Sequence, residues 1–197
     1  MKVSQNELIE AAKAGQVVSF PTDTVPALAV RPDRATAIFD LKRRSLEKPL
    51  ILMAANFLDL QPYIQGTPAE LAIWQQITQE YWPGALTLVL PASELVPEGI
   101  NPGDRTTIGI RVPDLPLARE ILSQTGALAT TSANHSGEPP LETTNAIAQA
   151  FPNVFLLHRS DLPCDVTVGS RLPSTVAKWT GKAWEILRQG NIVIKEK

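Results

Sequence analysis

Two arginines, Arg111 and Arg188, lie in apolar runs of the sequence, where a buried cation needs an anion as its partner. Arg111 lies in the apolar run of residues 106–112, and an arginine amid such neighbours is rarely buried without a paired anion. The partner could be an internal carboxylate, such as Asp23 or Asp114, or the carboxylate of a ligand. Arg188, near the end of a later apolar run, leaves the same alternatives open. Guanidinium groups bind carboxylates and phosphates through paired hydrogen bonds, so both residues are candidates for an anion site.

Four cations, Lys42, Arg43, Arg44 and Lys48, fall within seven residues. The first three lie at the end of a predicted helix, where cations suit the negative helix end, and alone they would indicate a solvated helix terminus. Lys48, however, leads directly into the apolar run of residues 49–52. The cluster therefore lies at a corner between helix and strand, where some of its members could bind an anion at the sheet edge.

Polar segments rich in hydroxyl groups follow several predicted strands. Residues 22–24, Thr-Asp-Thr, follow an apolar strand, and loops at strand ends often bind ligands in α/β folds. Residues 131–137, Thr-Ser-Ala-Asn-His-Ser-Gly, suit either an ordinary turn or several donors aimed at one anion. Ser174 begins a later strand and is a weak signal by itself. Taken with the arginines, these segments predict a pocket for a polar ligand with several negative charges.

The composition excludes several classes of protein. The sequence has no phosphate-loop, dinucleotide-binding, zinc-protease, paired-cysteine or serine-hydrolase motif, and its two histidines and one cysteine leave little for a metal site, so we assign no metal ligand. A net charge of -2 argues against a general polyanion-binding coat. We find neither a signal peptide nor an apolar run long enough to span a membrane. We therefore expect a cytoplasmic protein without membrane contact.

The elements that must position these residues alternate along the chain. A capping pattern from Ser4 to Glu7 predicts a first helix that ends at Gly15. Further helices are expected near residues 33–43, 56–64, 68–81, 115–124 and 142–150. Strands are expected near residues 16–21, 27–31, 50–54, 85–90, 106–112, 127–131, 153–158, 174–179 and 183–188, the last two as a hairpin. This order predicts the α/β class, with a mixed sheet and flanking helices in a single domain over residues 1–197.

Seven motifs in fixed order resemble those of one family, the YrdC-like threonylcarbamoyl-adenylate synthases, in its single-domain form. They cover nearly the whole chain: Pro21–Val25 (PTDTV), Lys42–Arg44 with Lys48–Leu50 (KRR, KPL), Trp82–Thr87 (WPGALT), Thr107–Pro113 ending in Arg-Val-Pro, Thr131–Gly137 (TSANHSG), Pro173–Val176 (PSTV) and Ile186–Gly190 (ILRQG). The resemblance implies a YrdC-like fold, which is a twisted, open mixed sheet with a concave basic face.

The resemblance also implies a reaction and its participants. L-Threonine, bicarbonate or carbon dioxide, and ATP would give threonylcarbamoyl-AMP and pyrophosphate, and we expect Mg²⁺ to accompany ATP. A separate tRNA threonylcarbamoyl transferase complex would use the product to make threonylcarbamoyladenosine in tRNA. A concave basic face leaves direct binding of tRNA or double-stranded RNA open.

Site residues follow from the same resemblance, position by position. Thr24, Arg111 and Ser174 would bind threonine, with Arg111 pairing its carboxylate. The ATP-binding set would be Arg44, Lys48, Thr107, Ser132, Asn134 and Arg188. Lys42 and Arg44 would act in catalysis by neutralising phosphate charge.

The chain departs from the family pattern in the loop after Val25. The family continues with Tyr-Gly-Leu, whereas this chain has Pro26, Ala27 and Leu28. Proline removes a backbone donor and fixes φ, so this loop must differ from the usual one. Met53 and Lys48 also replace a common histidine and asparagine. The alternative is therefore a nucleotide- or RNA-binding relative without this activity.

Overall fold

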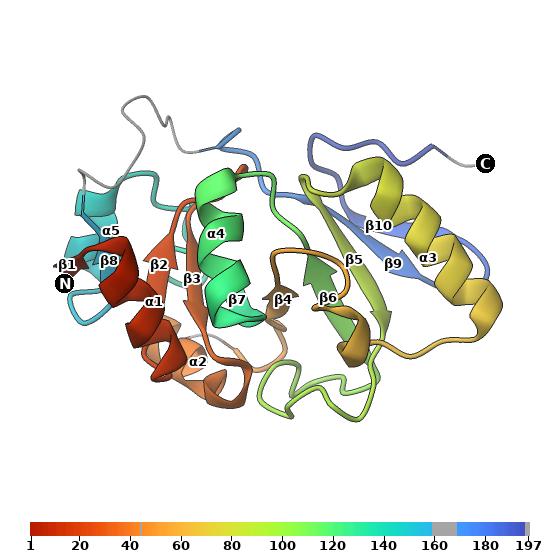
Figure 1. Ribbon diagram of the computed structural model, residues 1–197, viewed down its shortest axis with the longest axis horizontal. Helices are drawn as coiled ribbons and strands as arrows, with labels where there is room; N and C mark the ends of the chain where they lie inside the picture. Colours follow the sequence, from red (N-terminus) through yellow and green to blue (C-terminus); the bar gives the residue numbers. More distant parts are fainter. Residues whose placement is uncertain (44, 159–168, 196–197) are drawn as a thin grey trace.

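A ten-stranded mixed sheet organises the computed structural model, which describes residues 1–43, 45–158 and 169–195. The strands are β1 (Lys2–Val3), β2 (Val18–Phe20), β3 (Ala27–Val30), β4 (Ile51–Met53), β5 (Leu86–Pro91), β6 (Thr107–Arg111), β7 (Leu128–Ser132), β8 (Phe155–Leu157), β9 (Thr175–Trp179) and β10 (Trp184–Arg188). Their order across the sheet is β1-β8-β2-β3-β7-β4-β6-β5-β9-β10 (Figure 1). The sheet is mixed, because it contains parallel pairs, such as β4 with β6, and antiparallel pairs, such as β3 with β7.

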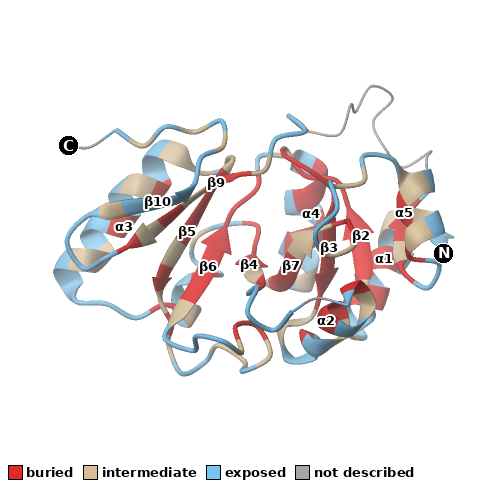
Figure 2. Cartoon of the chain, turned by 180° about the vertical axis from the view of Figure 1, so that it is seen from behind, coloured by how far each residue is buried: buried red, intermediate tan, exposed pale blue. Residues whose placement is uncertain are grey.

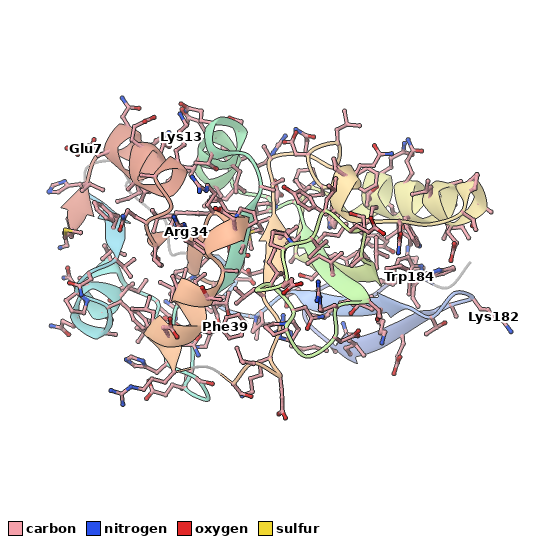
Figure 3. All side chains as sticks on the ribbon, turned by 90° about the horizontal axis from the view of Figure 1, so that it is seen from below. Glu7, Lys13, Arg34, Phe39, Lys182 and Trp184 are labelled. Carbon is pink, nitrogen blue, oxygen red and sulfur yellow. The ribbon has the colours of Figure 1, made fainter. Side chains whose placement is uncertain are left out.

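Five α-helices flank this sheet in the described ranges. They are α1 (Gln5–Lys13), α2 (Thr36–Lys42), α3 (Pro68–Tyr81), α4 (Pro116–Thr125) and α5 (Thr144–Ala150). Local sequence explains where two of them begin, because Ser4 with Glu7, and Thr67 with Glu70, form reciprocal capping boxes at α1 and α3. Figure 3 shows Glu7 and Lys13 along α1. No helix in the described chain is both long and apolar enough to cross a membrane.

Strand alternation gives the β4–β10 half of the sheet two different faces. On one face, apolar side chains of β4, β5, β6 and β9 pack with α2 and with the fully buried Trp74 of α3. On the other face, alternate residues of the same strands line a cavity. Helices α1 and α4 pack instead over β2 and its neighbours, in the other half of the sheet. Figure 2 views the β4–β10 half of the sheet from the side opposite to α3.

The predicted fold class is confirmed, as are the helix at residues 68–81 and the antiparallel β9–β10 hairpin. The helix predicted at residues 56–64 is wrong, because only a 3₁₀ turn, Gln61–Tyr63, forms there. Asn56 and Asp59 bond through side chain and backbone, which satisfies these groups in a turn instead of a helix. The helix predicted at residues 33–43 is split into a 3₁₀ turn, Pro32–Arg34, and α2.

Strand β1 was not predicted, because it is two residues long and exists by pairing with β8 far along the chain. Residues from 2 to 188 contribute strands to this one sheet. The single domain over residues 1–197 stays a prediction.

Candidate functional site

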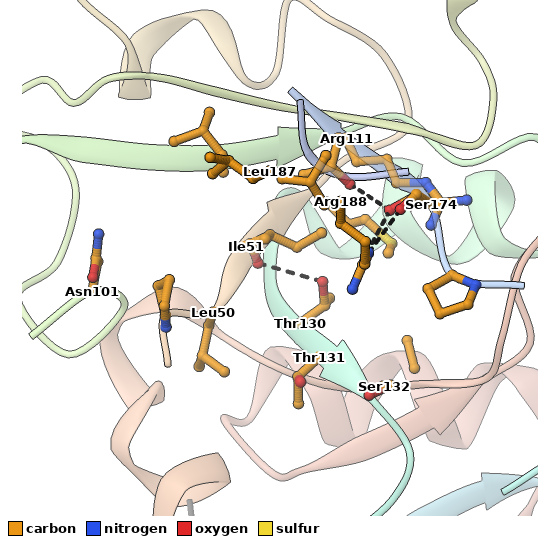
Figure 4. Close-up of a pocket in the computed structure, with 18 of the residues that line it drawn as sticks. Leu50, Ile51, Asn101, Arg111, Thr130, Thr131, Ser132, Ser174, Leu187 and Arg188 are labelled. Carbon is orange, nitrogen blue, oxygen red and sulfur yellow. Dashed lines mark hydrogen bonds between the residues drawn. The ribbon is translucent and has the colours of Figure 1, made fainter. Parts of the chain in front are cut away.

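A cavity of about 610 Å³ lies on the face of the sheet opposite α3. That volume falls within the range usual for small-molecule sites. Strands β4, β5, β6, β7, β9 and β10 all contribute to it, together with the loop before β3. Figure 4 shows Arg111, Arg188 and Ser174 together in one part of the cavity, with Asn101 well apart from them.

Arg111, the last residue of β6, is held by three protein acceptors. Its Nε donates to the Gly84 carbonyl at 3.0 Å, Nη1 to Thr24 Oγ1 at 2.8 Å, and Nη2 to Asp23 Oδ1 at 2.6 Å. The side chain is 3% exposed. These bonds use three of the five N–H groups of a guanidinium, so one N–H remains on each terminal nitrogen. That is the number of donors a carboxylate needs for bidentate binding.

Arg188 reaches the cavity because β10 is irregular. Ile186 pairs with Ala177, but the next paired residue is Arg188, opposite Val176, so Leu187 is an extra residue in the strand. A regular ladder would place Arg188 opposite Thr175, on the other face of the sheet, because successive side chains alternate. The bulge therefore directs Arg188 to the same face as Val176, which lines the cavity.

Ser174 joins Arg188 to the middle of the sheet. Arg188 Nε donates to the Ser174 carbonyl at 3.0 Å, and Nη2 lies 3.2 Å from Ser174 Oγ. The same hydroxyl lies 2.8 Å from Thr87 Oγ1 of β5. Gly190 allows the end of β10 to lie close to the backbone before β9. A Cβ at this position would lie only 2.4 Å from the Pro173 carbonyl oxygen. The motifs around Thr87, Ser174 and Arg188 thus form one hydrogen-bonded wall.

The electrostatics of this wall favour an anion. Burial holds the pKa of Arg188 below its ordinary value, and the positive charge of Arg111 acts in the same direction. Burial also lowers the pKa of Arg111, opposed by the charge and hydrogen bond of Asp23. Arginine stays protonated in proteins, so the lowered values express an unfavourable environment for two neighbouring cations. Asp23 offsets one charge, and an anionic ligand would offset the other.

The segment after β7 forms another wall of the cavity. Thr130, Thr131 and Ser132 line it, while Ser132 Oγ donates to Asn134 Oδ1 at 2.5 Å. The Ala133 amide donates to the Pro26 carbonyl at 2.8 Å, so this segment and the loop before β3 are held together.

Lys42, the last residue of α2, is buried behind that segment. Its Nζ donates to the Ser132 carbonyl and lies 3.4 Å from both Thr131 Oγ1 and Asn134 Oδ1. Lys42 therefore contacts the segment that lines the cavity without lining the cavity itself.

The part of the cavity around Asn101 contains the carboxylate of Asp104, with the ammonium group of Lys178 close enough to act on its pKa. Asp104 lies there and accepts hydrogen bonds from the amide and hydroxyl of Thr106 and from the Thr107 hydroxyl. These bonds, the Thr106 hydroxyl first, lower the pKa of Asp104. Asn101 Nδ2 donates to the Thr107 carbonyl at 3.1 Å. The cavity therefore offers hydroxyl and carboxylate groups here, in contrast to the two guanidiniums elsewhere.

Six of the residues selected from sequence line this cavity: Thr24, Thr107, Arg111, Ser132, Ser174 and Arg188. Lys42, Lys48 and Asn134 are not among the lining residues, and Arg44 lies outside the described residues. Of the alternatives left open for Arg111, the internal partner is Asp23, and Asp114 is not bonded to it.

Several other lining residues were given no role from sequence, among them the polar residues Thr87, Asn101, Thr130 and Thr131. Thr87 belongs to the WPGALT motif, which was a usable signal. Thr130 and Thr131 could have been found from their place at the end of a strand that leads into a polar loop. Asn101 lies in an irregular segment with no such signal.

Fold and site together define an α/β protein with a cavity, lined by two arginines, on one face of an open mixed sheet. The family model Sua5/YciO/YrdC, described as "Telomere recombination", matches residues 10–190. The chain belongs to this family.

Curated relatives are named threonylcarbamoyl-AMP synthase. The protein of Vibrio parahaemolyticus is 36% identical over 192 residues, covering 93% of this chain and 97% of the relative. The protein of an Escherichia coli strain is 36% identical over 151 residues, covering 75% of this chain and 78% of the relative.

Solved structures share the fold. Sua5 of P. abyssi complexed with L-threonine superimposes with a TM-score of 0.81 at 29% identity, covering 96% of this chain and 56% of that protein. This chain thus spans about half the length of the P. abyssi protein. YciO of E. coli gives a TM-score of 0.79 at 21% identity, covering 95% of this chain and 89% of that protein.

Proposed function

We propose that this chain is an L-threonylcarbamoyladenylate synthase, a nucleotidyltransferase that forms threonylcarbamoyl-AMP and pyrophosphate for the modification of tRNA. One observation carries the proposal. Arg111, Ser174 and Arg188, which are far apart in the sequence, lie together in one cavity large enough for a nucleotide beside an amino acid. The names of relatives that match nearly the whole chain support the same reaction.

The proposed reaction requires the protein to position its substrates and to neutralise their negative charge. The unprotonated amine of threonine attacks carbon dioxide, a C–N bond forms, and a proton leaves to give a carbamate. A carbamate oxygen then attacks the α-phosphorus of ATP, and the bond to pyrophosphate breaks. Arg111 and Arg188 are suited to hold the anionic groups in this sequence, and no covalent nucleophile is needed.

We assign the subsites from the family resemblance, supported by the side chains that line the cavity. Thr24, Arg111 and Ser174 bind threonine, with the remaining N–H groups of Arg111 on its carboxylate. ATP is bound by Thr107, Ser132 and Arg188 from the cavity wall, and the resemblance adds Arg44, Lys48 and Asn134 to this set. Lys42 acts with Arg44 in neutralising phosphate charge, through its contact with the segment that contains Ser132.

Magnesium would accompany ATP in this reaction. In the described ranges, no group of three or more histidine, cysteine, aspartate or glutamate side chains could hold a metal ion. Mg²⁺ commonly keeps several waters and is bound by substrate phosphates with few protein ligands. We therefore place the ion on the triphosphate, where it would neutralise charge as pyrophosphate leaves.

The partners of the proposed reaction follow from its product. Threonylcarbamoyl-AMP is a mixed anhydride, so a separate tRNA threonylcarbamoyl transferase complex in the cytoplasm would receive it. The family resemblance implies a concave basic face, on which tRNA or double-stranded RNA would bind directly through phosphate contacts that weaken as salt rises. Arg188 and Lys178, which line the cavity, are the candidates for these contacts.

The alternative, a relative that binds nucleotide or RNA without turnover, rests on Pro26 and Ala27. Both residues line the cavity, and Ala27 pairs with Ser132 in register, so the altered loop still closes against the segment after β7. The named relatives favour the synthase over this alternative.

The experiment is pyrophosphate release with ATP, bicarbonate and a panel of amino acids. Threonine-dependent release, abolished when bicarbonate is removed, supports the synthase. ATP binding by calorimetry without release under any condition supports the alternative and overturns the proposal.

A further inference from the structure

Asp23 lies partly buried beside the cavity without lining it. Its Oδ1 accepts from Arg111 Nη2 at 2.6 Å, and its side chain is 14% exposed. Its backbone carbonyl accepts from the Ser170 amide at 2.9 Å, so a segment from the far end of the chain fixes the loop that carries it. Asp23 is therefore fixed at the backbone and at the carboxylate.

The contacts of Arg111 show what that fixation does. Gly84, Thr24 and Asp23 hold three different nitrogens of the guanidinium, which sets both its position and the plane in which it lies. Asp23 is the charged one of the three partners. Hydrogen bonds to charged groups contribute more than neutral ones, so Asp23 is the strongest of these restraints.

The charge of Asp23 has a second effect. Arg188 lies close enough to Arg111 for the two positive charges to repel, and the carboxylate of Asp23 offsets part of that repulsion. Asp23 reduces the charge of this group from two positive charges to one. A single positive charge suits the one carboxylate of an amino acid and leaves Arg111 oriented in the free protein.

We propose that Asp23 is a positioning residue for the amino-acid subsite, acting through Arg111 and not through contact with substrate. The inference rests on the proposed function for the identity of the amino acid. Loss of the carboxylate would free Arg111 to turn away from Arg188, and threonine would then have to reorient it on binding. Binding would weaken for threonine and not for ATP.

The test compares Asp23→Asn with the unaltered protein and with Asp33→Asn. Asp33 is a matched control, because it also pairs with an arginine, Arg31, at 2.6 Å, and it lies outside the cavity. We expect Asp23→Asn to raise the KM for threonine about tenfold and to change the KM for ATP less than twofold, with Asp23→Glu recovering part of the loss. Asp33→Asn should change neither KM.

The outcomes separate this inference from the proposed function. Equal increases in both KM values, or an unchanged KM for threonine in Asp23→Asn, overturn the positioning role. If the unaltered protein releases no pyrophosphate, the synthase proposal fails, and threonine binding by calorimetry decides the inference instead. A tenfold weaker threonine affinity in Asp23→Asn then supports it, while equal affinity, or no threonine binding to the unaltered protein, overturns it.

Discussion

At the scale of the residue, Arg111 is the side chain that we propose binds the carboxylate of the amino acid. Replacement by alanine removes both remaining N–H donors and leaves the partly buried Asp23 without its cation. A charged hydrogen bond contributes about 1.5–3 kcal/mol, so kcat/KM for threonine should fall roughly ten- to a hundredfold in Arg111→Ala. Steady-state pyrophosphate release at varied threonine measures this.

The control for that variant is Arg31→Ala, because Arg31 forms an exposed ion pair with Asp33 outside the cavity. It should keep the threonine dependence of the unaltered protein. If Arg111→Ala has the same threonine dependence as Arg31→Ala, Arg111 does not bind the substrate carboxylate.

At the scale of the element, the pairing of β10 with β9 decides where Arg188 points. Deletion of Leu187 would restore a regular ladder in which Arg188 directly follows Ile186 and stays opposite Val176, on the cavity face of the sheet. We expect the deletion variant to keep the ATP binding that Arg188→Ala loses, measured by calorimetry. Leu187 itself is 53% exposed, so little burial is lost with it.

The comparison variant is Leu187→Ala, which keeps the extra residue and shortens only the side chain. It should bind ATP within about threefold of the unaltered protein, a difference under roughly 1 kcal/mol. A deletion variant that folds, shown by a cooperative thermal transition, and binds ATP as weakly as Arg188→Ala would contradict this account of the register.

At the scale of the whole molecule, several carboxylates make the stability of the fold depend on pH in the acidic range. The pKa values of Glu7 and Glu70 are lowered chiefly by the backbone amides of Ser4 and Thr67, that of Asp33 by Arg31, and that of Asp104 by Thr106. Lowered pKa values mean that the unfolded chain binds more protons. Their stabilisation is therefore present above the ordinary carboxylate pKa of about 4 and is lost as pH falls through the lower folded values.

Urea unfolding should show a nearly constant midpoint from pH 7 to about 5.5 and a decline below about 4. Glu70→Gln keeps a side chain that can complete the capping box of α3 but cannot titrate, so it should show a shallower decline. A midpoint that rises on acidification would contradict the sign of these shifts.

Much of the fold was readable from local sequence, because its causes are local. The capping box at Thr67 and Glu70 and the apolar spacing after it determined α3 to the residue. The antiparallel β9–β10 hairpin followed from two apolar runs around Gly181, whose φ of 88° suits a turn. The polar turn at Asn56 and Asp59 was misread, since side-chain bonds there compete with the helix.

Sequence alone also determined which residue types could bind an anion, because an arginine in an apolar run requires a partner wherever the chain folds. Only the tertiary structure decided which partner and which cavity. Asp23 and Ser174 reach Arg111 and Arg188 through pairings between distant strands, and Leu187 redirects Arg188 through a register shift that no local pattern marks. Those contacts depend on long-range closure of the sheet, which spacing along the chain does not specify.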